Sequence, residues 1–204
     1  RTMSPIQGLS EVTRMPRLGV IRLGVKEESS RGSLYPRAVD YFVCPPEVEA
    51  VVGERPKVLN ILLPGNEVED NLPLWLKQYG SSKGLVCKGD GQQAQRVNAE
   101  TGELVPIECR YKTCDRFMAG DCKAIGVLSF LLPNVPGFGV WQIATGSFNS
   151  IVNLQSEMQL AKRVCGRLAG IPFQLTLEPI EVAPNGKKKT VWVLHLRSPL
   201  TLLD

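Results

Sequence analysis

The stretch Ser147–Pro172, SFNSIVNLQSEMQLAKRVCGRLAGIP, carries the clearest secondary-structure pattern in the chain. Apolar side chains recur in it at alternating steps of three and four residues, which places them on one face of an α-helix. Ser147 can cap this helix, and Gly170-Ile171-Pro172 must end it. The apolar stripe consists of Ile151, Leu154, Met158, Ala161, Cys165 and Leu168. We therefore expect one long helix whose apolar face is buried against a sheet.

Strand-like segments lie on both sides of this helix. They are Ile125–Leu132 and Gly139–Ala144 upstream, and Phe173–Val182 and Thr190–Arg197 downstream. The downstream pair is joined by Pro184-Asn185-Gly186, and an Asn-Gly pair between alternating apolar runs is a strong hairpin signal. Residues 124–204 thus predict a ββαββ unit. The fold class that follows is α+β, with a mixed or antiparallel sheet and the long helix covering one face.

Residues 1–82 predict a β-rich N-terminal part of the same main domain. Apolar or β-branched runs bounded by Gly and Pro are typical of strands. The runs are Leu18–Lys26, Val39–Val43 and Val58–Leu63, and Glu47–Gly53 predicts a short helix. Asn71–Tyr79 predicts a second short helix, because Leu72, Trp75 and Tyr79 have helical spacing.

The composition limits the class of protein. The chain has 204 residues, of which 43% are hydrophobic and 22% charged, enough for one domain with its own core. No apolar run approaches the roughly 18–20 residues of a membrane span, and the N-terminus lacks a secretory signal pattern, so we expect a cytoplasmic protein without membrane contact.

Charge is divided unevenly along the chain. Lys and Arg number seven against three acids in residues 1–37, nine against thirteen in 38–122, and eight against four in 123–204. This division suggests basic and acidic surfaces that meet different partners, but charge alone identifies none of them.

Cys87, Cys109, Cys114 and Cys122 fall within 36 residues that are rich in Gly, Asp, Lys and Gln and have no apolar periodicity. Such a segment cannot form a core of its own. Four thiolates around one Zn2+ would supply the missing folding free energy, on the order of 10 kcal/mol in small zinc modules. Residues 83–123 thus predict a zinc-binding insertion, with a structural metal that has no open position for water.

Other interpretations of these cysteines remain open. The intervals of 21, 4 and 7 intervening residues are irregular, and no paired C-x2-C is present. Disulfides would suit a secreted chain, for which nothing here argues. Buried thiols usually lie in apolar runs, as Cys44 and Cys165 do. Whether Cys44 belongs to the metal set is left open.

Motifs for catalysis are lacking. The sequence contains no G-x-x-x-x-G-K-[ST], G-x-S-x-G or H-E-x-x-H motif, and His195 is its single histidine. A hydrolytic metal would need carboxylates such as Asp90, Asp115 and Asp121, which in loops are more often turn formers. Thr145-Gly146-Ser147 can present backbone N–H groups to an anion, although an N-cap is the commoner role. We expect no enzymatic activity.

Several short motifs occur along most of the chain. They are Arg55-Pro56-Lys57 leading to Leu63-Pro64, Trp75 to Gly80, Cys87 to Gly91, Cys122-Lys123, Pro136-Gly137, Gly139 to Ile143 and Thr145 to Ile151. Together they resemble phage-type recombination directionality factors, which also occur in bacterial genomes under names such as "hydrolase or metal-binding protein". The resemblance runs from about Pro5 to Val182 and is most specific over Gly137–Ile151.

The resemblance implies a non-enzymatic accessory of a large serine integrase, encoded by a phage or its bacterial host. Such a factor binds the integrase on DNA and changes how its zinc and coiled-coil regions associate, so that excision replaces integration. The physical requirement is a surface that prefers one of two integrase arrangements, by about 1.4 kcal/mol for each tenfold bias.

A second interpretation is a zinc-containing nucleic-acid-binding module with a ferredoxin-like sheet, as in RNA-recognition and CRISPR effector subunits. The residues that would stack on bases or contact phosphates are Trp192, Phe173, Lys187, Lys188, Lys189 and Arg197. Against it, six basic residues from Cys87 to Lys123 are balanced by six acids, so this segment has no net attraction for phosphate.

Overall fold

The structure, a computed structural model, describes residues 14–201 except 29–31, 33, 81–83 and 184–185. Its largest sheet is a mixed seven-stranded one, in which β1 pairs parallel with β10 and every other pair is antiparallel. In spatial order the strands are β1 (Arg17–Val20), β10 (Val140–Thr145), β9 (Cys122–Phe130), β5 (Leu74–Gly80), β6 (Gly84–Gly89), β7 (Gln93–Val97) and β8 (Leu104–Glu108).

Two smaller sheets and several helices complete the described fold. The three-stranded sheet has the order β12 (Lys189–Arg197), β11 (Pro172–Val182) and β4 (Val58–Leu62), and β2 (Arg22–Glu28) pairs with β3 (Leu34–Val43). The helical segments are α1 (Pro46–Val52), α2 (Val68–Asn71), η1 (Tyr111–Thr113), α3 (Asp115–Met118) and α4 (Phe148–Cys165). The α+β class is therefore confirmed.

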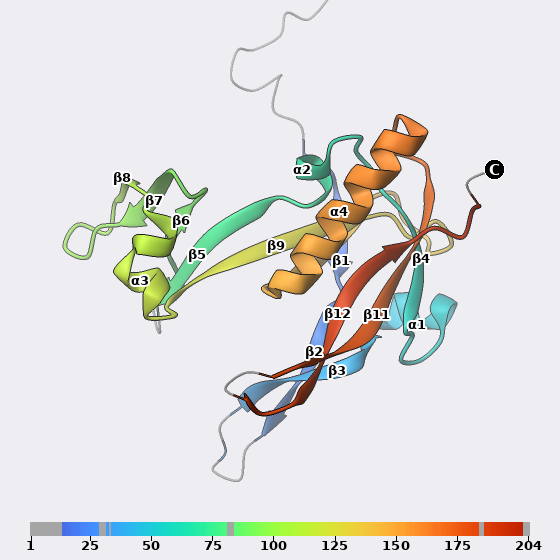
Figure 1. The fold of residues 1–204 in the computed structure, drawn as a ribbon, viewed down its shortest axis with the longest axis horizontal. Helices are drawn as coiled ribbons and strands as arrows, with labels where there is room; N and C mark the ends of the chain where they lie inside the picture. Colours follow the sequence, from blue (N-terminus) through green and yellow to red (C-terminus); the bar gives the residue numbers. More distant parts are fainter. Residues whose placement is uncertain (1–13, 29–31, 33, 81–83, 184–185, 202–204) are drawn as a thin grey trace, which may run out of the picture.

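Figure 1 shows a main body and a separate lobe that are joined by the long strands β5 and β9. We call residues 84–122 the lobe; it contains β6, β7, β8, η1 and α3. The hydrophobic core cluster belongs to the main body, because it includes no described residue from 73 to 127. Its largest fully buried side chains include Trp141, Phe42, Phe130, Ile143 and Leu154.

The helix predicted from Ser147–Pro172 is present as α4. The Ser147 hydroxyl accepts the Ser150 N–H at 3.3 Å, as expected of an N-cap. The helix ends earlier than predicted, at Gly166, whose φ of 71° is favourable for glycine. Cys165, assigned to the buried stripe from sequence, is exposed at this end.

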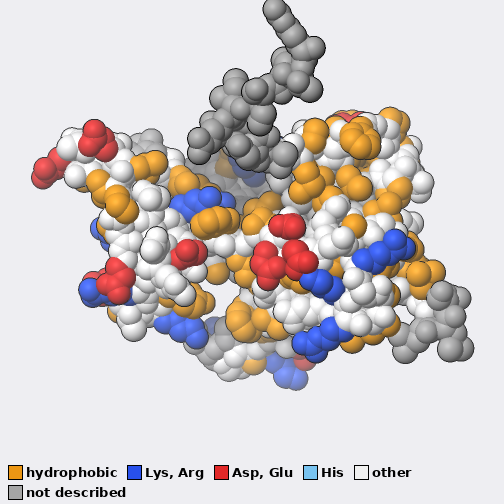
Figure 2. Space-filling model, turned by 90° about the horizontal axis from the view of Figure 1, so that it is seen from above, with side chains coloured by type: hydrophobic (Ala, Val, Ile, Leu, Met, Phe, Trp, Pro, Cys, Tyr) orange, Lys and Arg blue, Asp and Glu red, His pale blue; other side chains and the backbone are white. Residues whose placement is uncertain are grey.

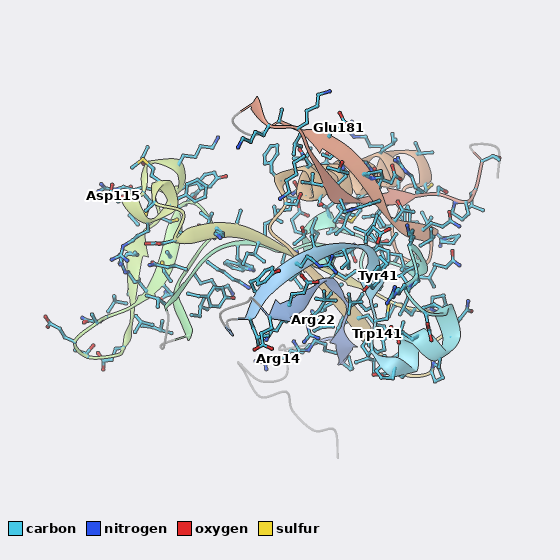
Figure 3. The ribbon with its side chains drawn as sticks, turned by 90° about the horizontal axis from the view of Figure 1, so that it is seen from below. Arg14, Arg22, Tyr41, Asp115, Trp141 and Glu181 are labelled. Atoms are coloured by element: carbon cyan, nitrogen blue, oxygen red, sulfur yellow. The ribbon has the colours of Figure 1, made fainter. Side chains whose placement is uncertain are left out.

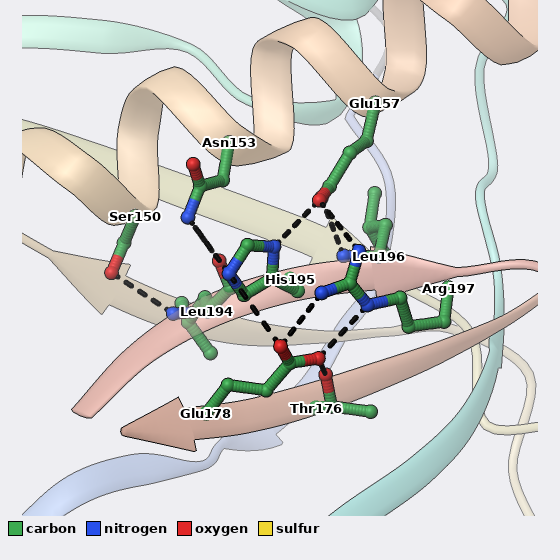
Figure 4. A network of polar contacts seen from close by, with 9 residues as sticks. All are labelled: Ser150, Asn153, Glu157, Thr176, Glu178, Leu194, His195, Leu196 and Arg197. Atoms are coloured by element: carbon green, nitrogen blue, oxygen red, sulfur yellow. Dashed lines mark hydrogen bonds and ion pairs between the residues drawn. The ribbon is translucent and has the colours of Figure 1, made fainter. Parts of the chain in front are cut away.

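We expected α4 to pack over one face of a sheet. In the structure its polar side chains instead contact the free edge of β12 (Figure 4). The outward N–H of Leu194 donates to Ser150 Oγ at 3.0 Å, and that of Leu196 donates to Glu157 Oε2 at 2.6 Å. Unpaired edge N–H groups are a template for association with other strands. Two α4 side chains thus satisfy the edge that β12 would otherwise expose.

Glu157→Ala is expected to lower the free energy of unfolding by about 2 kcal/mol, because it leaves the Leu196 N–H without a charged acceptor. The same change removes the 2.6 Å contact between Glu157 Oε1 and His195 Nδ1. Urea denaturation measures the loss. Gln159→Ala, an exposed change on the same helix, should stay within about 0.5 kcal/mol of the parent. Equal losses in both variants would contradict the edge-capping role.

Three expectations from sequence are wrong. Asn71–Tyr79 is not a helix, since α2 ends at Asn71 and Leu74–Gly80 forms β5 between β9 and β6. Leu18–Lys26 is divided into β1 and β2, which lie in different sheets. The strands that flank α4 also lie in two sheets, so they do not form the single sheet of a ferredoxin-like fold.

The predicted pairing of the two C-terminal strands is confirmed, since β11 pairs antiparallel with β12 and Val182 lies opposite Lys189. Of its turn, residues 184–185 lie outside the described part of the chain, and Gly186 has a φ of 77°.

Candidate functional site

The register of the lobe strands places two cysteines on one sheet face. Cys122 of β9 and Cys87 of β6 both lie opposite Gln78 of β5, and Cys87 lies opposite Arg96 of β7. Directly opposite residues on neighbouring strands point to the same face. Gln78 is buried between the two cysteines at 7% exposure. The sheet therefore presents two thiols and a guanidinium group side by side.

The segment after β8 folds back toward this face and contributes the other two cysteines. Cys109 follows β8 directly, and Cys114 precedes the first residue of α3. An edge-to-face pair of Tyr111 and Phe117, with ring centroids 4.9 Å apart, connects η1 to α3. A Cβ atom at Gly89 would lie 3.0 Å from Cys109 Sγ, so glycine at this position allows the sulfur to approach the sheet.

All four cysteines line one small pocket of about 40 Å³. The polar and charged side chains that share it are Gln78, Arg96, Glu108 and Arg116, and the hydrophobic ones include Leu76, Ile107 and Phe117. Sites for organic ligands are usually several hundred Å³ in volume. The cysteine pocket is therefore much smaller than the usual site for an organic ligand.

The thiols in this pocket influence one another electrostatically. Burial raises the pKa of Cys87; Arg96 lowers it, and Cys109 and Cys114 raise it further. The pKa of Cys122 is raised as well, first by burial and then by the neighbouring thiols of Cys87, Cys109 and Cys114. These shifts agree with the common position of the four cysteines around one pocket.

The cysteine pocket is not a formed metal-binding site, and Cys44 is not part of it. Among the described residues, no three or more His, Cys, Asp or Glu side chains are grouped in an arrangement that could hold a metal ion. The four cysteines thus line the same pocket but do not form a complete set of metal ligands. Cys44 does not line this pocket but belongs to the core of the main body, where burial raises the pKa of its thiol to about 11.

The three carboxylates considered for a hydrolytic metal do not line the cysteine pocket. Asp90 Oδ1 accepts the N–H groups of Gln92 and Gln93, each at 2.8 Å, and these bonds lower the pKa of Asp90. Asp115 begins α3, and Asp121 precedes β9. At Asp90 the turn-forming role expected of such acids is confirmed.

The side chains considered for nucleic-acid binding are not gathered in one place. Lys189 is the first residue of β12 and follows Lys187 and Lys188, whereas Arg197 is the last residue of β12, roughly 26 Å from Lys189 at the usual rise of a strand. Arg197 is already paired with Glu178 through bonds of 2.8 and 2.6 Å. Phe173 is 4% exposed and cannot stack on a base, so its assignment from sequence is wrong.

A polar network between α4 and the three-stranded sheet went unnoticed in the sequence (Figure 4). His195 Nδ1 lies 2.6 Å from Glu157 and Nε2 lies 3.1 Å from Asn153. Both ring nitrogens of His195 are therefore engaged by side chains of α4. Asn153 and Glu157 are about 40 residues from His195 in the sequence, so no local sequence pattern could have predicted their contact. The network joins α4 to β12 and β11.

Part of the surface of α4 is apolar and uncovered. Leu160 and Val164, one turn apart near the C-terminal end, are 64% and 56% exposed. Lys162 and Arg163 lie in the same last turn. Figure 2 shows hydrophobic side chains gathered on the upper surface of the main body, where this end of α4 lies in Figure 1. Figure 3, from the opposite side, shows polar and charged side chains projecting from both parts of the molecule.

These features describe an α+β protein whose lobe carries a pocket lined by four cysteines. No helix in the described part of the chain has both the length and the apolar character needed to cross a membrane. A family model described as Gp3-like, recombination directionality factor-like, matches residues 18–199. The chain belongs to this recombination directionality factor-like family. No curated protein and no solved structure matches it.

Proposed function

We propose that the protein is a non-enzymatic accessory factor that binds a serine integrase on DNA and biases recombination toward excision. The observation that carries this proposal is the family match over residues 18–199. A factor of this kind acts where the integrase meets its DNA, in the cytoplasm of a bacterial host.

The C-terminal end of α4 is the surface that we assign to the integrase. Exposed apolar side chains that adjoin one another mark protein-binding surfaces more often than isolated ones do. Full burial of a Leu or Val side chain contributes about 1.5–3 kcal/mol. A contact to Leu160 and Val164 in only one integrase arrangement would thus supply a tenfold or larger bias, since tenfold requires about 1.4 kcal/mol.

The test combines binding with recombination. Purified protein is added to the serine integrase encoded in the same genome, on DNA that carries either the integrated or the unintegrated attachment sites. We expect at least a tenfold rise in excision. Leu160→Glu should weaken integrase binding by at least tenfold, because it places a charge in the contact.

Gln159→Glu is the matched control, because it adds the same charge at the adjacent exposed position on the other flank of α4. If the parent protein neither binds the integrase nor changes the products, the proposed function is wrong. If the parent acts but the two variants behave alike, only the surface assignment is wrong. Strong binding of free RNA or DNA that weakens steeply with salt would instead favour the nucleic-acid interpretation.

A further inference from the structure

We propose that Cys87, Cys109, Cys114 and Cys122 bind one Zn2+ ion, which takes the place of a hydrophobic core in the lobe. This inference does not depend on the integrase.

The first argument is the lack of a core in the lobe. Only Gly89 and Ala94 are buried among its described residues, and none of them joins the core cluster of the main body. Segments of about 40 residues rarely fold on hydrophobic burial alone and usually need a disulfide, a metal or a partner. The described cysteines are all free, so disulfides do not hold the lobe in this structure.

The second argument is the position of the four thiols in the fold. Cys87 comes from β6, Cys122 from β9, Cys109 from the end of β8, and Cys114 from the start of α3. One ion among them connects the sheet to the helical segment that lies over it. Four cysteine ligands are the usual set of a structural zinc site. The sulfurs must close to about 2.3 Å from the ion, and the glycine at position 89 leaves Cys109 the room to approach.

The third argument is charge. Zn2+ with four thiolates carries a net charge of −2, whereas four protonated thiols carry none. Arg96 and Arg116 both line the pocket, and Arg96 lies directly opposite Cys87. Glu108 also lines it, but this carboxylate contacts Arg110 at 3.4 Å. Two guanidinium groups beside four thiols are an arrangement that stabilises the charged, metal-bound form.

Metal analysis of the full chain, purified under reducing conditions without added metal, tests the proposal. We expect close to one zinc per chain. Cys109→Ser and Cys114→Ser should each release the metal, and hydrogen exchange should then increase in the lobe while the main body stays protected. Two control variants should retain the zinc of the lobe: Cys165→Ser, at an exposed position of α4, and Cys44→Ser, in the core of the main body.

A milder variant separates metal binding from misfolding. Arg96→Gln keeps all four sulfurs and should keep zinc, but with an affinity at least tenfold lower in competition with a chelator. Absence of metal, iron in place of zinc, or a full zinc content in both Cys109→Ser and Cys114→Ser would overturn the proposal. A mass lower by two or four hydrogens, from disulfides in the native protein, would overturn it as well. Each result stands whether or not the protein binds an integrase.

Discussion

Phe130→Ala should lower the free energy of unfolding by about 3–5 kcal/mol. Phe130 is fully buried and lies opposite Trp141 in the pairing of β9 with β10, within the core cluster of the main body. Truncation removes the ring and leaves a cavity in the core cluster, to which all three sheets contribute side chains. At roughly 2–4 °C per kcal/mol for a chain of this size, the melting temperature should fall by about 10 °C.

Phe138→Ala is the matched control, because it removes the same ring from a side chain that is 98% exposed. It should shift the melting temperature by no more than a degree or two, since exposed substitutions stay within about 0.5 kcal/mol. Scanning calorimetry measures both variants. A small loss for Phe130→Ala would show that the main body repacks around the gap, contrary to the single close-packed core described here.

Replacement of residues 81–119 by the dipeptide Asn-Gly should remove all zinc and leave the main body folded. The pairing of Gln78 with Cys122, extended by two residues, places Gly80 opposite Gly120, and a two-residue Asn-Gly turn fits such a hairpin. The core cluster loses no side chain in this exchange. The thermal transition of the main body should therefore change by less than about 1 kcal/mol.

The parent protein and the lobe replacement are compared by calorimetry and metal analysis. If the shortened chain does not fold, the lobe is part of the main domain, and the predicted insertion boundaries of 83–123 are wrong. If it folds but still binds one zinc, the metal site lies outside the lobe. Loss of excision together with a folded main body would assign part of the proposed function to the lobe.

Helix α4 could be predicted from sequence because its signal is local. Leu154 and Met158 repeat at helical spacing, and Ser147 is a good cap. The segment at Leu74–Gly80 shows the opposite case. Leu72, Trp75 and Tyr79 have helical spacing and therefore predicted a helix. Pro73 argues against that helix, because the residue before a proline rarely adopts the helical conformation. The strand forms because its neighbours β9 and β6 pair with it, which no local pattern reveals.

The cysteine cluster was also predictable, but only in part. Four thiols in a segment without apolar periodicity indicated a shared site, and the structure places all four around one pocket. The two arginines could not be found in this way, because their place depends on strand register and on the fold of η1 and α3. The same reason applies to Glu157 and His195, which are 38 residues apart in the chain and meet only across α4 and β12.

The shared ladder of β5 and β9 has a mechanical consequence. These strands pair from Leu74 opposite Gly126 to Gln78 opposite Cys122, so the lobe is attached by hydrogen-bonded ribbon and not by loose chain. Among the described strands, β10 pairs with β9 as far as Gly126, and β6 pairs with β5 from Leu76 onward, so only the Trp75–Ile125 pair lacks a third strand beside it. The lobe strands therefore continue the sheet of the main body, and a partner that binds both parts could reorient the lobe only by twisting or bending this sheet.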